Sequence, residues 1–180
     1  MARIYPVERD ADSKTRELLG AVEKKMGMVP NMISTMAQSP TVIQAYLGFA
    51  QSLAKGSLSD PLRQEIALAV SEANQCHYCL SAHTFLGSKV GLSESDLIDA
   101  RHGTASDEKT NAALAFARKI AEDRGHVSDK DVEEVRRAGY TYGEIAEIVA
   151  NVALTTFTNY FNNVAGTEID FPVAPSLATV

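Results

Sequence analysis

The chain places both of its cysteines and a histidine within one short stretch of sequence. Cys76 and Cys79 are separated by two residues, and His83 follows four positions after the second cysteine. On a helix these three positions lie on one face. A thiol reacts as its thiolate, which a helix N-terminus, a second thiol or a neighbouring histidine favours. The spacing therefore predicts a reactive dithiol with a nearby base.

The two cysteines are expected to have different roles. His83 lies one helical turn after Cys79 but nearly two turns after Cys76, so we expect it to deprotonate Cys79. Attack of Cys79 on the O–O bond of a peroxide would leave a sulfenic acid, with which Cys76 can condense to form a disulfide. An external dithiol reductant would then be needed to restore both thiols.

A carboxylate that holds the histidine would complete a proton relay, and two glutamates precede the motif. In an unbroken helix Glu72 would lie roughly 6 Å along the axis from Cys76, and Glu65 about 16 Å away. We therefore predict Glu72 as the partner. The alternative left open is that the helix breaks at Asn74-Gln75, which would change which glutamate lies near the motif. Such a break is plausible because asparagine is a poor interior helix residue and a good cap.

Two other interpretations of the motif are weaker. Two buried core thiols would be ordinary in many proteins, but a C-x-x-C pair followed by histidine favours redox use. A zinc site could use Cys76, Cys79, His77 and His83, yet structural zinc usually takes its second pair of ligands from a distant segment.

Composition limits the class of protein. The chain has 180 residues and a formal charge of −6, which argues against nucleic-acid binding. No apolar run approaches the roughly 20 residues that cross a bilayer, and the first residues lack the pattern of a secretory signal. We expect a cytoplasmic protein that binds neither nucleic acid nor membrane. A single domain should cover residues 1–180, with its core at about 10–165.

Apolar residues recur at helical spacing along the chain, which predicts an all-α bundle of about eight helices. Caps and glycines delimit the segments. The predicted helices lie at 13–26, 30–38, 40–55, 61–74, from the motif to about 90, shortly after 93, at 107–124, 129–138 and 142–165. The tail from 166 to 180 is expected to be extended and to lie over a neighbouring subunit. Asn159, Asn162 and Asn163 are unusual in an apolar helix and suggest a helix end or a hydrogen-bond network between subunits.

Two blocks resemble a known family. The segments LRQEIALAVSEANQCHYCLSAHTFLG and FTNYFNNVAGTEIDFP resemble the AhpD-like alkylhydroperoxidases of the carboxymuconolactone decarboxylase family, and most closely their peroxidase-related branch. The resemblance covers about residues 10–173. It implies an all-helical, homo-oligomeric protein that reduces hydroperoxides by a dithiol–disulfide cycle without haem, flavin or metal. It also implies that electrons come from a dithiol, such as a lipoyl-bearing protein.

The resemblance assigns roles to individual residues. Cys79 would attack the peroxide, Cys76 would be the second thiol and His83 would relay protons. The glutamate of the family relay usually stands twelve positions before the first cysteine, where this chain has Gln64. Glu65 is adjacent but would face another side of the helix, so Glu72 remains the predicted substitute.

The expected function is therefore that of a thiol-dependent alkyl hydroperoxide reductase, with a hydroperoxide as substrate. Two alternatives remain. One is a lyase like the decarboxylases that share the fold, in which acid–base groups and not thiols do the chemistry. The other is a non-enzymatic, redox-sensing oligomer in which the disulfide alters assembly.

Overall fold

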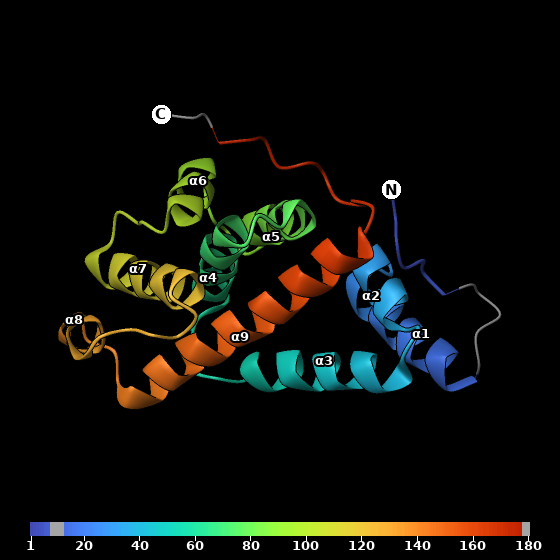
Figure 1. The fold of residues 1–180 in the computed structure, drawn as a ribbon, viewed down its shortest axis with the longest axis horizontal. Coiled ribbons are helices and arrows are strands. Elements are labelled where there is room, and N and C mark those ends of the chain that lie inside the picture. Colours follow the sequence, from blue (N-terminus) through green and yellow to red (C-terminus); the bar gives the residue numbers. More distant parts are fainter. Residues whose placement is uncertain (8–12, 178–180) are drawn as a thin grey trace.

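The structure is a computed structural model and describes residues 1–7 and 13–177. These residues form nine α-helices and no β-strand (Figure 1). The prediction of an all-α bundle of about eight helices is confirmed, and each of the predicted segments corresponds to one of the nine helices. The helices are α1 Ser13–Met26, α2 Asn31–Met36, α3 Pro40–Leu53, α4 Asp60–Ala73, α5 His77–Lys89, α6 Glu94–His102, α7 Glu108–Glu122, α8 Asp129–Arg137 and α9 Tyr142–Ala165.

Local capping signals set most helix starts. Ser39 and Ser59 each accept a hydrogen bond from the backbone of their helix's first turn, and a proline follows in that turn. Full capping boxes begin three other helices, and they consist of Ser93 with Asp96, Ser128 with Asp131, and Thr141 with Glu144. Because these interactions join residues three apart, the sequence alone could predict them.

Helix α4 lies at the centre of the bundle and packs against α5, α6, α7 and α9. Its residues Ile66, Leu68 and Val70 are completely buried. The long helix α9 crosses the molecule diagonally and also contacts α3 (Figure 1). One apolar cluster joins α4 to α6, α7, α8 and α9, and a second joins α1, α2, α3 and α5. Both cysteines belong to the second cluster.

The chain breaks sharply between α4 and α5. Asn74 ends α4, Gln75 adopts the left-handed conformation with φ 53°, and Cys76 is the N-cap of α5. A non-glycine residue adopts this conformation at a cost of roughly 1 kcal/mol, so surrounding contacts must hold it. The break that the sequence left open is therefore present, and α5 returns along α4.

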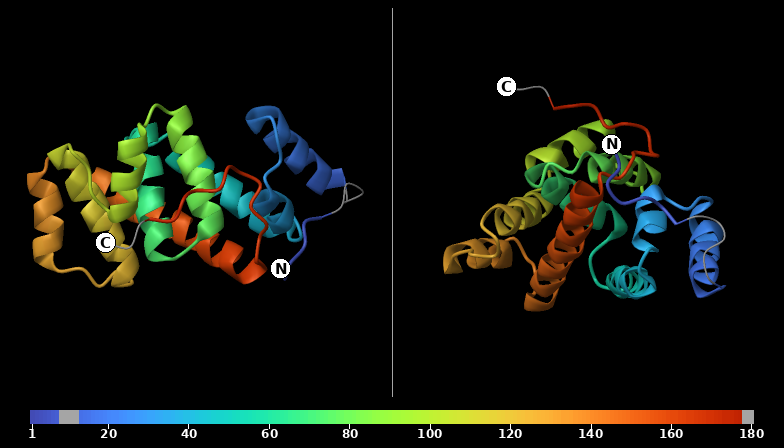
Figure 2. Two further views of the ribbon diagram at one scale, coloured as in Figure 1. Left: turned by 90° about the horizontal axis from the view of Figure 1, so that it is seen from above. Right: turned by 45° about the vertical axis from the view of Figure 1, so that its right-hand side comes forward.

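The C-terminal tail is extended, as predicted, but it packs on its own chain. Figure 2 shows it passing over α5. The backbone N–H of Ala174 donates to Ser81 Oγ at 3.1 Å, and Arg101 donates to the carbonyl of Pro175 at 2.7 Å. The described part of the tail therefore contacts α5 and α6 of its own chain, and the expected contact with a neighbouring subunit stays a prediction.

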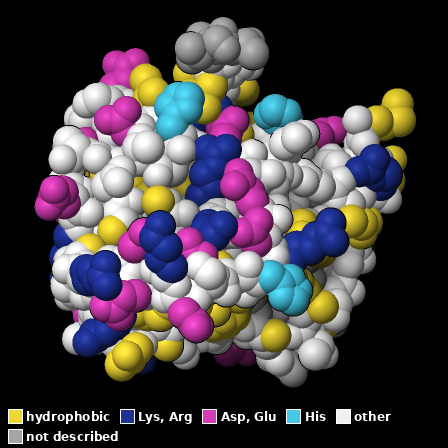
Figure 3. Space-filling view, turned by 60° about the vertical axis from the view of Figure 1, so that its left-hand side comes forward, with side chains coloured by type: hydrophobic (Ala, Val, Ile, Leu, Met, Phe, Trp, Pro, Cys, Tyr) yellow, Lys and Arg dark blue, Asp and Glu magenta, His cyan; other side chains and the backbone are white. Residues whose placement is uncertain are grey.

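The exterior carries charges of both signs. Acidic and basic side chains are interspersed on the face that Figure 3 shows. Across the described ranges, none of the helices combines the length and the apolar character needed to cross a bilayer.

Candidate functional site

The two cysteine sulfurs lie at disulfide distance, with their Cα atoms 5.3 Å apart. Cys76 is completely buried and Cys79 is 2% exposed. Cys76 caps α5, and its Sγ accepts a hydrogen bond from the backbone N–H of Cys79 at 3.3 Å. The break before α5 therefore places both sulfurs at a helix N-terminus, where the backbone dipoles favour a thiolate.

Cys79 and His83 line one small cavity of about 80 Å³. Most of the remaining wall is apolar or aromatic, and it includes Met32, Ile33, Tyr46, Tyr78, Leu86 and Phe171. Cys76 does not line this cavity. Cys79, and not Cys76, is therefore the cysteine that borders the cavity.

His83 has a neutral partner. Its Nδ1 lies 2.8 Å from Oε1 of Gln64, so Nδ1 carries the proton and donates, which leaves the lone pair on Nε2. Burial lowers the pKa of His83 to about 4. The ring is thus neutral at physiological pH and can accept a proton. Gln64 occupies the position at which the family's glutamate was expected.

Glu72 does not take the predicted place beside His83. Its Oε2 accepts a hydrogen bond from Arg101 Nε at 2.7 Å, and the Arg101 side chain is only 5% exposed. Because the chain reverses at Gln75, residues near the start of α4, and not those near its end, lie beside His83. The ion pair of Glu72 instead joins α4 to α6.

Glu65 also lies away from the cysteines. It lines a second cavity that shares no residue with the first. Its position one residue after Gln64 turns it to another side of α4, as predicted.

The zinc interpretation finds no support in the described part of the chain. None of its His, Cys, Asp and Glu side chains form a group of three or more that could hold a metal ion. His77 is exposed to solvent, whereas both cysteines are buried.

Asn162 contacts the sulfur of Cys79, a contact that the sequence did not reveal. Its Nδ2 donates to Cys79 Sγ at 3.3 Å, and the side chain is 3% exposed. Its Oδ1 is buried without a hydrogen-bond partner. A donor aimed at sulfur favours the thiolate over the thiol. The only sequence signal was the cluster of asparagines in an apolar helix.

The other two asparagines of that cluster hold the break between α4 and α5. Asn74 donates to Asn159 Oδ1 at 2.9 Å, and Asn163 donates to the carbonyl oxygen of Asn74 at 3.1 Å. Asn159 in turn donates to Ser71 Oγ at 3.1 Å. The network predicted between subunits therefore exists within one chain, where α9 holds the turn that positions Cys76.

The tail and α2 close the aromatic side of the cavity. Tyr78 donates to Asp170 Oδ1 at 2.8 Å and accepts from the backbone N–H of Met32 at 3.2 Å. Phe171 packs edge-on to Tyr78, with their ring centroids 5.8 Å apart. Asp170 and Phe171 lie in the second block of the resemblance, which was the available signal for their involvement.

Replacing Asn162 by alanine is expected to lower the reactivity of the Cys79 thiol at neutral pH by about tenfold to a hundredfold, since a hydrogen bond to a charged group contributes roughly 1.5–3 kcal/mol. The midpoint of the pH dependence of Cys79 alkylation by iodoacetamide should move to higher pH, because the thiolate loses a donor. Asn151→Ala is the matched control, since Asn151 is a buried asparagine of α9 that donates within its own helix. Equal alkylation profiles for both variants would contradict the role of Asn162.

Comparisons with known proteins were consistent with this geometry. The family model described as "Carboxymuconolactone decarboxylase family" matches residues 40–123, which include both cysteines and His83. A search of curated proteins found no significant match. Among solved structures, an uncharacterised peroxidase-related protein of Ralstonia eutropha JMP134, described as an alkylhydroperoxidase AhpD core, is 25% identical with a TM-score of 0.83, and 94% of each chain is covered.

Two further solved structures are similar over the same extent. The debrominase Bmp8 is 25% identical with a TM-score of 0.80, over 93% of this chain and 92% of that one. A peroxidase-related protein of Silicibacter sp. TM1040 has the same fold, with 23% identity and a TM-score of 0.81, over 92% of both chains. The family model matches slightly less than half of the chain, so these comparisons show the AhpD-like fold together with a similarity to the carboxymuconolactone decarboxylase family.

Proposed function

We propose that the chain is a thiol-dependent hydroperoxide reductase, with Cys79 as the attacking thiol, Cys76 as the resolving thiol and His83 as the base. One observation carries the proposal. Cys79 and His83 line the same cavity, while the sulfur of Cys76 lies behind Cys79 at disulfide distance. The match to the family model and the similarity to an AhpD-like structure support enzymatic activity of this kind.

The proposed cycle has three steps. His83 takes the thiol proton of Cys79, and the thiolate attacks the nearer peroxide oxygen; the O–O bond breaks and the alcohol leaves with the proton from His83. Cys76 then attacks the sulfur of the sulfenic acid, which forms the disulfide and releases water. An external dithiol finally exchanges with the disulfide, becomes oxidised and returns two thiols to the protein.

The reductant is expected to enter through the same cavity. Cys79 is reachable from it, whereas Cys76 is completely buried. We therefore propose that the reductant attacks Cys79 Sγ and that Cys76 leaves as the thiolate. A dithiol on a narrow arm, such as a dihydrolipoyl group of a partner protein, suits this access. We also propose that the protein works as a homo-oligomer, because the resemblance implies one.

The proposal is tested by titrating the reduced protein with cumene hydroperoxide under anaerobic conditions. We expect the loss of two thiols per chain for one equivalent of peroxide, and their recovery with dihydrolipoamide. Steady turnover with both reagents should follow. A protein that forms the disulfide and changes its native mass but shows no turnover is a redox sensor, and this result would reject the peroxidase.

Reductive debromination is a second candidate, which the similarity to Bmp8 favours. The apolar wall with Tyr46, Tyr78 and Phe171 can hold an aromatic ring. Here the Cys79 thiolate would take the bromine, a proton would replace it on the ring, and Cys76 would displace bromide to form the same disulfide. Release of bromide from a bromopyrrole, compared with peroxide consumption by the same protein, decides between the two substrates.

A further inference from the structure

A second cavity of about 460 Å³ lies apart from the cysteines. It is open to solvent and is bordered by the connection from α3 to α4, the start of α4, α6, the start of α7 and the start of α9. Leu58, Leu62 and Leu92 form an apolar wall, and the ring of Tyr140 adds to it. Cavities of roughly 300–1,000 Å³ are the usual size of small-molecule sites.

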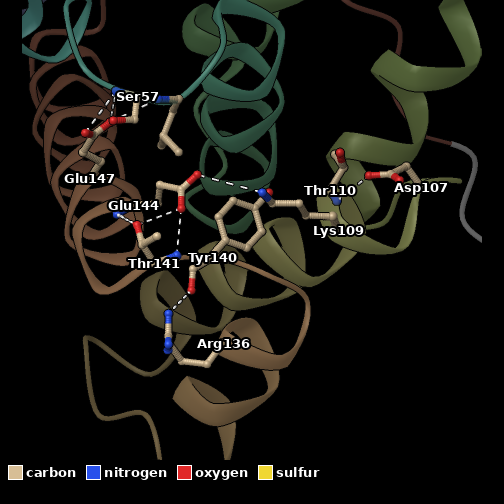
Figure 4. A network of polar contacts seen from close by, with 10 residues as sticks. Ser57, Asp107, Lys109, Thr110, Arg136, Tyr140, Thr141, Glu144 and Glu147 are labelled. Atoms are coloured by element: carbon tan, nitrogen blue, oxygen red, sulfur yellow. Dashed lines mark hydrogen bonds and ion pairs between the residues drawn. The ribbon is translucent and has the colours of Figure 1, made fainter.

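The lining of this cavity is strongly acidic. It carries four carboxylates and a single lysine, and these are Glu65, Asp96, Asp107, Glu144 and Lys109. Figure 4 shows the lysine between Glu144 and the ring of Tyr140. Its Nζ lies 3.9 Å from the Glu144 carboxylate and 4.5 Å from the ring centroid. The ammonium group of Lys109 thus already occupies part of the cavity.

Three of the four carboxylates have a structural role. Asp96 accepts from the backbone of Ser93 at 2.9 Å, Asp107 from that of Thr110 at 2.8 Å, and Glu144 from that of Thr141 at 2.7 Å. Figure 4 shows the last two. Each therefore caps the start of a helix, and capping explains its presence without any ligand.

Glu65 has no such role. Its side chain is 8% exposed, and within residues 1–7 and 13–177 it makes no hydrogen bond and no ion pair. It stands in the middle of α4, the central helix, among completely buried apolar residues. Burial and the nearby carboxylates Asp96 and Asp107 raise its pKa to about 6. At neutral pH it is therefore an ionised carboxylate without a partner in the described residues, on a largely buried side chain that lines the cavity.

We propose that this cavity binds an aliphatic amine in its ammonium form, with Glu65 pairing with the ammonium group and the leucine wall holding the carbon chain. The excess of carboxylates disfavours an anion, and the described residues lack a group arranged to hold a metal ion. A diamine suits the cavity well, because its second ammonium group can approach Asp107 at the exposed side. The proposal does not depend on the chemistry at Cys79.

Binding is tested by calorimetric titration of the full chain with cadaverine at pH 8 and low salt. We expect saturable binding below 10 mM, at least tenfold weaker binding by Glu65→Gln, and no binding of 1,5-pentanediol, which has the same length without charge. Glu94→Gln is the control, since it removes one exposed acidic charge from the first turn of α6. Absence of binding, or equal affinity in the wild type and Glu65→Gln, overturns the proposal.

Thermal unfolding gives a second measurement that does not need tight binding. The pKa of Glu65 is higher in the folded state, at about 6, than its ordinary value of 4.5. The contribution of this carboxyl group to the free energy of unfolding therefore falls as the pH rises through this interval, and it stays low above it. Glu65→Gln should therefore raise Tm by about 4 °C at pH 8 and much less at pH 5.

Other charged groups face the same cavity, namely Asp96 from α6, Asp107 and Lys109 at the start of α7, and Tyr140 and Glu144 at the start of α9. They are unchanged in Glu65→Gln, so the difference between the two proteins isolates Glu65. Cadaverine should raise Tm of the wild type only. An equal rise in both proteins contradicts the proposal. The native mass of Glu65→Gln is compared with that of the wild type. A change would mean that the cavity lies at a contact between two copies of the chain, and this result also overturns the proposal.

Discussion

Cys79→Ser is expected to consume hydroperoxide at least about a thousandfold more slowly than the wild type, since a hydroxyl is a far weaker nucleophile than a thiolate at neutral pH. The rate is measured by the loss of cumene hydroperoxide with dihydrolipoamide in excess. Cys79 is the sulfur that lines the cavity, so no other thiol can replace it. Wild-type turnover by this variant would reject the proposed function.

Cys76→Ser is the matched partner of that experiment. It keeps the attacking thiol, Asn162 and His83 in place, so one equivalent of peroxide should still react in a burst. The sulfenic acid cannot form the disulfide and should be trapped by dimedone on Cys79. A variant without the burst would mean that Cys76 is required for the attack itself, contrary to the assignment from the cavity.

His83→Ala is expected to lower kcat/KM for peroxide by about a hundredfold or more, within the range that general bases contribute. The physical reason is the lone pair on Nε2, which the hydrogen bond from Nδ1 to Gln64 leaves free. His102→Ala is the control, because His102 is an exposed histidine at the end of α6. Equal activity of the two variants would exclude His83 as the base.

Gln64→Glu tests the same base by its pH dependence. In the wild type, the pKa of His83 is lowered to about 4 by burial, so protonation of His83 should not reduce kcat/KM above about pH 5. A carboxylate at position 64 would favour the imidazolium and raise that pKa. Because the protonated ring cannot act as base, the acid limb of kcat/KM should move to higher pH by about one unit or more.

The control for this prediction is Gln51→Glu, which adds the same charge at an exposed position of α3. Its profile should match that of the wild type. If the acid limb stays in place in Gln64→Glu, the contact between Gln64 and His83 does not set the protonation of the base.

Helix positions were predictable because their signals are local. Ser93 with Asp96 and Thr141 with Glu144 are capping boxes within one turn, and the structure contains both. The limits of α1 follow in the same way from its apolar spacing and from Gly27, which has a positive φ of 78°. Local hydrogen bonds and backbone preferences act over three or four residues, and these can be seen directly in a sequence.

The relative positions of the two cysteines and the histidine were also predictable, because they depend on spacing within a short segment. Cys79 and His83 are four residues apart within α5 and therefore lie on one side of it, and Cys76 is the N-cap of the same helix. The proposed division of roles between the two thiols starts from this spacing, and Cys79 is the one of the two that lines the cavity.

The partner of the histidine depended on tertiary structure. An unbroken helix would have placed Glu72 nearest the motif, but the left-handed Gln75 reverses the chain and brings Gln64 to His83. Asparagines of α9, more than 80 residues away in sequence, hold that reversal. A single asparagine can cap a helix or continue it, and only contacts with a distant helix select between these states.

By itself, the sequence determined an all-helical chain with a dithiol and a histidine in register, because these properties depend on neighbours along one helix. The tertiary structure decided that an amide and not a carboxylate supports His83, that Asn162 donates to Cys79, and that Glu65 lines a separate cavity. These are contacts between segments far apart in sequence, and they depend on how α4, α5 and α9 pack around one another.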